Sequence, residues 1–417
     1  MRRLAEWRTY GIGQSRNPIQ IEITVPEMTA MALRNRVSRS LRTVSADVVP
    51  VGCSPVLFGR IGRAALLGMA LLVSGCVDDS QAESTAATGE ELKHPSDLQR
   101  VTNYPGGLAI AELSRWRDAT PEIEDIKIPS SADDSEQAAL FYDSGSDKEK
   151  PLLMVLHSWS TDYLQNIDIP LGQFAIANDW VFIHPNFRGQ NDGRPESTAS
   201  ELAISDMEDA LEYAREHAEI DGSRIYLLGY SGGAMNALHL SSRHPDVFAG
   251  VAAWVPVYDL VSWHTWNDRR GEKYAGEIEQ ACGGEPSQGS SAYDECRKRS
   301  PSSYVPDVQG DIRVLIAHGI DDTTVPPEQA LHAFNDLADA ADRIPQAQID
   351  QLMETREVPD ALRQRSLQGG EQFPHFAEAD TDVLLYLKSG PTELVLFEGE
   401  HDMLYRPGLE WLSRQQK

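Results

Sequence analysis

The chain has 417 residues, 41% of them hydrophobic and only 24 of them proline, a composition typical of a globular protein with a substantial core. Residues 1–63 hold ten Lys/Arg and four Asp/Glu, out of 37 and 64 in the whole chain, so the remainder carries a net charge of −33 with His neutral. A body this acidic repels nucleic acid and anionic membrane surfaces, which argues against a nucleic-acid partner.

Residues 60–76 have the form of a bacterial signal peptide, with two arginines, a short apolar run and then small residues. The apolar run is shorter than the roughly 20 residues that a membrane-spanning helix needs. It ends in Val73-Ser74-Gly75-Cys76, which resembles a lipoprotein box, so Cys76 is expected to be lipidated and to become the mature N-terminus. Residues 77–100 would then be an acidic tether. Residues 1–59 are expected not to be part of the mature protein, and translation is expected to start at Met31 or nearer Arg60. The alternative is an ordinary buried helix with a chance cysteine.

Strand-like and helix-like segments alternate from residue 101 to residue 417, beginning with a pair of short strands around a polar turn. In chain order they are strands 123–128, 138–142, 151–157 and 180–185, helix 200–217, strand 225–228, helix 234–243, strands 249–257, 312–317 and 392–397, and helix 408–415. This alternation predicts an α/β fold, with a mostly parallel sheet flanked by helices in a single catalytic domain.

Two insertions interrupt the alternation, at residues 258–306 and 339–380. Both are rich in Gly, Pro, Ser, Gln or charge, and we expect them to form lids over the strand ends, where open α/β sheets bind ligands.

The first insertion contains Cys282 and Cys296, and export to the periplasm or outer membrane would allow them to form a disulfide. A loop of that size gains about 3 kcal/mol in the chain-entropy model. The alternative is two unpaired thiols. No companion His/Cys pair lies at ligand spacing, so no metal site is expected.

The strand at 225–228 runs into Gly229-Tyr230-Ser231-Gly232-Gly233 and then into a helix, which is the sequence form of a nucleophile elbow. The glycines remove side chains that would block the tight turn, so Ser231 is the candidate nucleophile. An ordinary Gly-Ser loop also fits these five residues, so the choice between the two interpretations depends on whether a base and an acid follow at suitable positions in the chain.

A serine nucleophile needs a general base and a carboxylate that orients the base, in the chain order Ser, Asp, His. The strand at 312–317 is followed by Asp321 and Asp322, of which spacing favours Asp322, and the strand at 392–397 is followed by His401. His401 is therefore the candidate base. His332 lies in a helical pattern and His375 in an insertion, so both are poorer candidates.

A tetrahedral oxyanion needs two hydrogen-bond donors. The Gly232 N–H, which follows the nucleophile, is the first candidate. The second is expected from the loop after strand 151–157, either the Trp159 N–H or the Ser158 N–H, and the Tyr163 hydroxyl is an alternative.

Residues 120–417 resemble the catalytic domain of the prolyl oligopeptidase family of serine hydrolases. The resemblance rests on the Gly229–Gly233 motif, on His318-Gly319 with Asp322 and Val325-Pro326, on Gly399-Glu400-His401, and on Asn186-Phe187-Arg188-Gly189. It implies the α/β-hydrolase fold, and it implies Asp322 as the acid because the family places the acid four residues after the histidine of His-Gly.

The resemblance further implies a hydrolase that needs no cofactor and no metal. In the family's oligopeptidases a propeller domain restricts the substrate to short peptides, and such a domain would need several hundred more residues. The expected substrate is therefore either a small peptide or a carboxylic or carbohydrate ester. A hypothesis of another class is a non-catalytic lipoprotein that binds a ligand on the same fold. Arg188 is expected to brace loops through a carboxylate such as Asp206.

Overall fold

The computed structural model describes residues 92–95, 100–102, 110–368, 375–376 and 381–417. The predictions for residues 1–59, for the signal peptide with Cys76 and for most of the acidic tether fall outside the described residues. Within the described ranges, no helix is long and apolar enough to cross a membrane.

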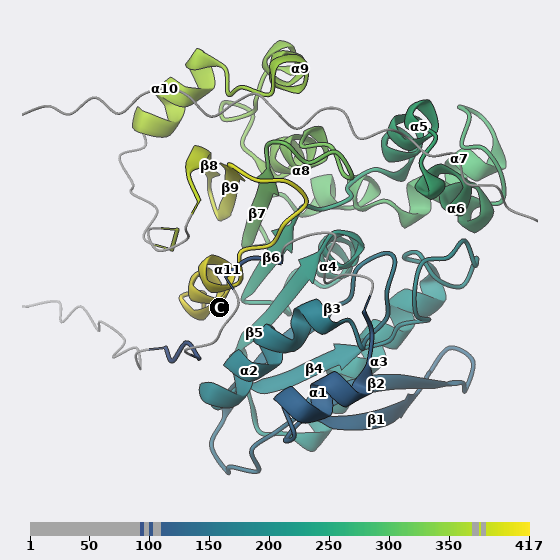
Figure 1. The fold of residues 1–417 in the computed structure, drawn as a ribbon, viewed down its shortest axis with the longest axis vertical. Coiled ribbons are helices and arrows are strands. Elements are labelled where there is room, and N and C mark those ends of the chain that lie inside the picture. Colours follow the sequence, from purple (N-terminus) through teal and green to yellow (C-terminus); the bar gives the residue numbers. More distant parts are fainter. Residues whose placement is uncertain (1–91, 96–99, 103–109, 369–374, 377–380) are drawn as a thin grey trace, which may run out of the picture. The chain divides into compact units, whose positions relative to one another are not determined.

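A nine-stranded sheet forms the centre of the fold, with the strand order β1-β2-β4-β3-β5-β6-β7-β9-β8 (Figure 1). The strands from β4 through β3, β5, β6 and β7 to β9 pair in parallel, whereas β1, β2 and β8 pair antiparallel at the two edges. Their bounds are β1 Glu124–Pro129, β2 Glu136–Tyr142, β3 Lys150–Leu156, β4 Val181–Pro185, β5 Ile220–Tyr230, β6 Gly250–Trp254, β7 Val314–Gly319, β8 Val383–Ser389 and β9 Thr392–Phe397. The parallel centre confirms the predicted α/β-hydrolase fold class.

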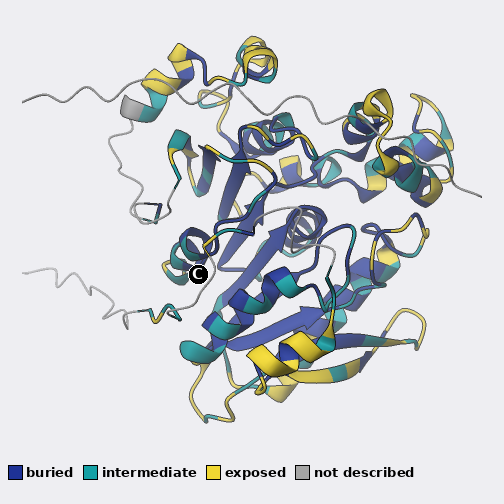
Figure 2. Ribbon diagram, viewed as in Figure 1, coloured by how far each residue is buried: buried dark blue, intermediate teal, exposed yellow. Residues whose placement is uncertain are grey.

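Helices cover both faces of this sheet, as the continuous apolar strands require. Successive residues of β3 point to opposite faces: Leu152 joins one buried cluster, and Leu153 joins the other. The first cluster packs under α3 (Glu201–His217), α4 (Gly232–Arg243) and α8 (Glu328–Leu337), and the second under α1 (Leu113–Ala119), α2 (Ile169–Ala177) and α11 (Tyr405–Ser413). In Figure 2 the central strands are buried, whereas most of the edge strand β1 is exposed.

The first insertion folds into three short helices, α5 (Leu260–Arg270), α6 (Lys273–Cys282) and α7 (Ser291–Arg299), which we call the cap. The turns η2 (Pro301–Ser303) and η3 (Val305–Val308) follow the cap, and η1 (Asn166–Asp168) precedes α2. The second insertion contains α9 (Gln346–Thr355) and α10 (Asp360–Gln368), which lie apart from the cap (Figure 1).

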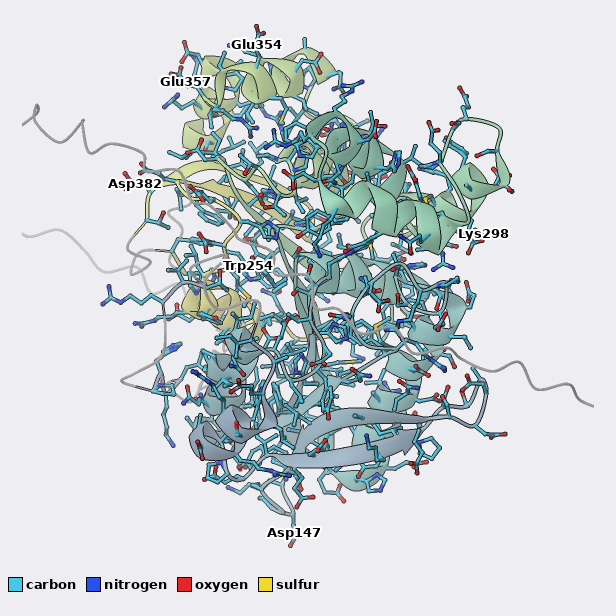
Figure 3. The ribbon with its side chains drawn as sticks, turned by 45° about the vertical axis from the view of Figure 1, so that its right-hand side comes forward. Asp147, Trp254, Lys298, Glu354, Glu357 and Asp382 are labelled. Atoms are coloured by element: carbon cyan, nitrogen blue, oxygen red, sulfur yellow. A yellow bond between two sulfur atoms is a disulfide. The ribbon has the colours of Figure 1, made fainter. Side chains whose placement is uncertain are left out.

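The cap has its own small core, and a disulfide crosses it. Cys282 and Cys296 are bonded, with their Cα atoms 5.3 Å apart, and the bond joins the end of α6 to α7. Both cysteines pack in one buried cluster with Trp159 and Val325, so the cap core is continuous with the loops after β3 and β7. Figure 3 shows the charged side chain of Lys298 on α7 pointing outward from the cap, while Trp254 of β6 lies inside the fold.

Candidate active site

Ser231 occupies a sharp turn between β5 and α4. Its backbone has φ 57° and ψ −118°, a conformation that costs energy for a residue with a side chain and that recurs at functional sites. Gly229 and Gly233 permit this turn, since a Cβ on Gly229 would lie 2.5 Å from Ala234 N and one on Gly233 would lie 2.8 Å from His157 O. The strand-turn-helix context expected of a nucleophile elbow is therefore present.

His401 lies in the loop after β9, and its imidazole faces the Ser231 hydroxyl at an Nε2 to Oγ distance of 3.0 Å. On its other side, Nδ1 donates to Asp322 Oδ2 over 2.6 Å. An ionised carboxylate only accepts hydrogen bonds, so the proton is held on Nδ1 and Nε2 is left to accept the serine proton. All three side chains are buried, and the structure thus brings together the three residues predicted from separate strand ends.

Asp322 accepts hydrogen bonds on both carboxylate oxygens. Oδ1 accepts from Thr324 N (2.8 Å) and Val325 N (2.9 Å), which fixes the carboxylate plane toward His401. Burial alone would raise the pKa of Asp322, but the charges and hydrogen bonds of His401 and His318 outweigh burial and hold this pKa well below its usual value. The neighbouring Asp321, in contrast, is exposed, so the geometry distinguishes the two candidates.

His318 is a second histidine at this carboxylate, and the sequence pattern indicated it only as the residue from which the spacing to Asp322 is counted. Its Nε2 donates to Val325 O over 2.9 Å and lies 3.2 Å from Asp322 Oδ2. The next residue, Gly319, contacts the loop of the base, because a Cβ there would lie 2.5 Å from Gly399 O and closer still to Glu400 O. The His-Gly pair after β7 therefore contacts both Asp322 and the loop that carries His401.

The loop after β3 and the start of α4, directly after Ser231, each carry a candidate oxyanion donor on the backbone. A Cβ on Gly232 would lie 2.7 Å from Trp159 N, so the loop after β3 closely approaches the start of α4. Among the described residues, neither the Trp159 N–H nor the Gly232 N–H donates to another group. The Ser158 N–H, in contrast, donates to Gln165 Oε1 over 3.0 Å. Of the three candidate N–H groups, those of Trp159 and Gly232 therefore stay candidates for binding an oxyanion, and that of Ser158 already has an acceptor.

Gln165 supports this loop from the inner side. Its Oε1 accepts hydrogen bonds from Ser158 N, Ser158 Oγ and Thr161 Oγ1, and its Nε2 donates to the buried carboxylate of Asp168. Because the carboxylate accepts only, Asp168 sets which way the Gln165 amide faces. His184 Nε2 lies 3.1 Å from the same carboxylate.

Two other side chains considered from the sequence, Tyr163 and Arg188, contact groups outside the Asp322–His401–Ser231 row. The Tyr163 hydroxyl donates to Asp125 Oδ1 over 3.1 Å at the surface. The Arg188 guanidinium donates to Asp206 through Nε (2.6 Å) and Nη2 (2.9 Å), which is the bracing predicted for it.

The hydroxyl of Tyr230, next to the nucleophile, donates to the backbone carbonyl of His401 over 2.5 Å and so connects the two loops. No cluster of three or more His, Cys, Asp or Glu side chains within the described ranges is arranged to hold a metal ion.

Residues 173–355 match the model of the prolyl oligopeptidase family. The matched range includes Ser231 and Asp322, whereas His401 lies beyond it. Among curated proteins, acylamino-acid-releasing enzyme 2 from Oryza sativa subsp. japonica is 26% identical over 203 residues, which is 44% of this chain and 26% of that protein. This chain therefore spans about a quarter of that relative's length.

Two solved structures illustrate the structural similarity. The acylaminoacyl peptidase of Pyrococcus horikoshii aligns with a TM-score of 0.41 at 15% identity, over 52% of this chain and 34% of its own. A structure from a study of two prolyl endopeptidases aligns with a TM-score of 0.39 at 16% identity, over 51% of this chain and 31% of its own.

Proposed function

We propose that the chain is a serine hydrolase of the prolyl oligopeptidase family, whose model residues 173–355 match, and that Ser231, His401 and Asp322 hydrolyse a small peptide or ester through an acyl-enzyme. The observation that carries the proposal is the continuous hydrogen-bonded row from Asp322 through His401 to Ser231, with distances of 2.6 Å and 3.0 Å. A serine hydroxyl is too weak a nucleophile at neutral pH without such a base.

In the first half of the reaction, His401 Nε2 accepts the Ser231 proton as Oγ attacks the substrate carbonyl carbon. The carbonyl oxygen gains negative charge and accepts hydrogen bonds from the Gly232 and Trp159 N–H groups. His401, now an imidazolium beside Asp322, gives its proton to the leaving amine or alkoxide. The C–N or C–O bond then breaks and leaves the acyl group on Ser231.

In the second half, a water molecule takes the place of the leaving group. His401 removes one proton from this water, the resulting oxygen attacks the acyl carbon, and the proton returns to Ser231 Oγ as the acid product departs. Asp322 keeps the imidazole in one tautomer throughout, because its carboxylate is itself fixed by backbone N–H groups.

We favour a short, N-acylated peptide as the substrate. The family match and the acylamino-acid-releasing relative support a peptide, and the non-peptide alternative is a carboxylic or carbohydrate ester. A panel of acetyl-alanyl p-nitroanilide, Ala-Ala p-nitroanilide and p-nitrophenyl acetate, assayed with wild type and Ser231→Ala, tests the proposal. We expect Ser231-dependent release of p-nitroaniline, fastest for the acetylated substrate. Turnover of the ester alone would contradict the peptide assignment.

We also propose that the protein is exported and anchored to the bacterial envelope through a lipid on Cys76. The lipoprotein-box sequence supports this, and so does the Cys282–Cys296 disulfide, because disulfides persist in oxidising compartments. Metabolic labelling with an alkyne fatty acid, comparing wild type with Cys76→Ala, is the test. Label that persists in Cys76→Ala, or wild type recovered without label, would overturn the anchor.

A further inference from the structure

The loop that carries Trp159 is supported on its outer side by one helix of the cap. The Trp159 indole Nε1 donates to Glu277 Oε2 on α6 over 2.7 Å. One turn earlier on the same helix, Lys273 Nζ donates to Glu277 Oε1 (3.0 Å) and to Ser160 Oγ (3.1 Å). Two successive residues of the loop are therefore attached to one ion pair on α6.

This attachment restrains the orientation of a buried group. Trp159 is only 2% exposed, and its ring packs edge-to-face against Trp263 of α5 with centroids 4.9 Å apart. A buried indole N–H needs an acceptor, and the carboxylate of Glu277 supplies a charge-assisted one. Lys273 neutralises that carboxylate and, at four residues' spacing on a helix, holds it in place.

The indole and the oxyanion donor belong to the same residue, so the two are mechanically connected. A Cβ on Gly232 would lie 3.0 Å from both Cα and Cβ of Trp159, which leaves the loop little space toward the nucleophile. On the far side, Gln165 holds Ser158. If the contact with Glu277 is lost, the buried indole N–H has no acceptor. Because the ring is packed against Trp263 and has little space to rotate on its own, bringing its N–H to another acceptor displaces the backbone of Trp159 and with it the backbone N–H.

We propose that Glu277, assisted by Lys273, is a positioning residue that keeps the Trp159 N–H directed at the oxyanion. This inference rests on the proposed function, since it assigns a role within the same reaction. Neither side chain touches the reacting atoms. Their effect is transmitted through Trp159. Loss of either side chain should raise the free energy of the transition state more than that of the bound substrate, because negative charge develops on the carbonyl oxygen only in the transition state.

The test compares Glu277→Ala, Glu277→Gln and Glu279→Ala in the full chain, using a substrate that wild type turns over. Losing one oxyanion donor costs about a hundredfold in kcat, so Glu277→Ala should lower kcat by roughly 10- to 100-fold with KM changed less than about twofold. Glu277→Gln keeps an oxygen acceptor and should recover most of the rate. Glu279→Ala, which removes a different contact of the same helix, to His264 (2.9 Å), should behave as wild type.

Wild-type kcat in Glu277→Ala would overturn the proposal, as would an equal loss in Glu279→Ala, which would show a general effect of cap packing. A readout that does not need turnover is the indole N–H resonance of Trp159, assigned with Trp159→Phe. This resonance should move in Glu277→Ala and stay in Glu279→Ala, and no movement would refute the contact. If wild type turns over no substrate, the proposed function fails, and the resonance still decides whether Glu277 holds Trp159.

Discussion

Substitution of Gly319 by alanine should displace the loop that carries His401. The new Cβ would lie 2.5 Å from Gly399 O and closer still to Glu400 O, whereas ordinary van der Waals contact begins at 3.4 Å, so the loop has to move by at least about 0.9 Å. Overpacking of this kind typically costs about 1–3 kcal/mol of stability. A misplacement of about 1 Å at a reacting group costs about a hundredfold in rate, or about 2.7 kcal/mol of activation free energy.

Steady-state kinetics on the best substrate of the panel measure this effect. We expect kcat/KM of Gly319→Ala to fall about a hundredfold while the far-ultraviolet circular dichroism spectrum of the protein is unchanged. Gly222→Ala is the matched control, because a Cβ at Gly222 meets nothing within 4 Å, and it should retain wild-type activity. A folded Gly319→Ala protein with wild-type kcat/KM would refute the claim that a Cβ at position 319 displaces the loop that carries His401.

Replacing Cys282 and Cys296 together by alanine should lower the unfolding free energy by about 3 kcal/mol in the chain-entropy model, measured by urea titration, and an unchanged midpoint would contradict this. Burial, and then the charge of Arg243, lower the pKa of His239 from 6.5 to about 3. Only the unfolded chain therefore takes up this proton between those pH values, so the unfolding free energy should fall by about 1.4 kcal/mol per pH unit below about pH 6. The slope should be shallower in His239→Gln, and equal slopes would exclude His239 as the cause. Gln165→Leu should lower kcat at least tenfold, since the loop that carries the oxyanion donor loses its inner support, and kinetics with unchanged kcat would reject that role.

The strand ends were predictable because their signals are local. The turn at Ser231 has no room for a Cβ on Gly229 or Gly233, so it requires glycine at both positions. This requirement can be recognised from the five residues 229–233 alone. The order of Asp322 and His401 after two later apolar strands then needed only the rule that parallel strands end at one edge of a sheet. The same rule, however, gave no reason to prefer the Trp159 N–H over the Ser158 N–H.

The supporting residues were not predictable, because each acts over a long separation in sequence. Glu277 lies 118 positions from Trp159, in a charged helix where a glutamate ordinarily faces solvent. Gln165 is a single amide with no pattern around it. The antiparallel edge strand β8 also went unpredicted, because it follows an insertion and has no helix between it and β9. Such contacts depend on how distant segments pack, which periodicity does not encode.

Labelling with a fluorophosphonate probe, followed by mass spectrometry of the modified peptide, tests whether Ser231 is an activated nucleophile. Such probes react with a serine only when a base and an oxyanion site activate it. We predict one label per folded chain, located on Ser231, absent from Ser231→Ala and strongly slowed in His401→Ala. Folded wild-type protein that takes up no label, or that takes up the same label after Ser231→Ala, would contradict the assignment of Ser231 as the nucleophile.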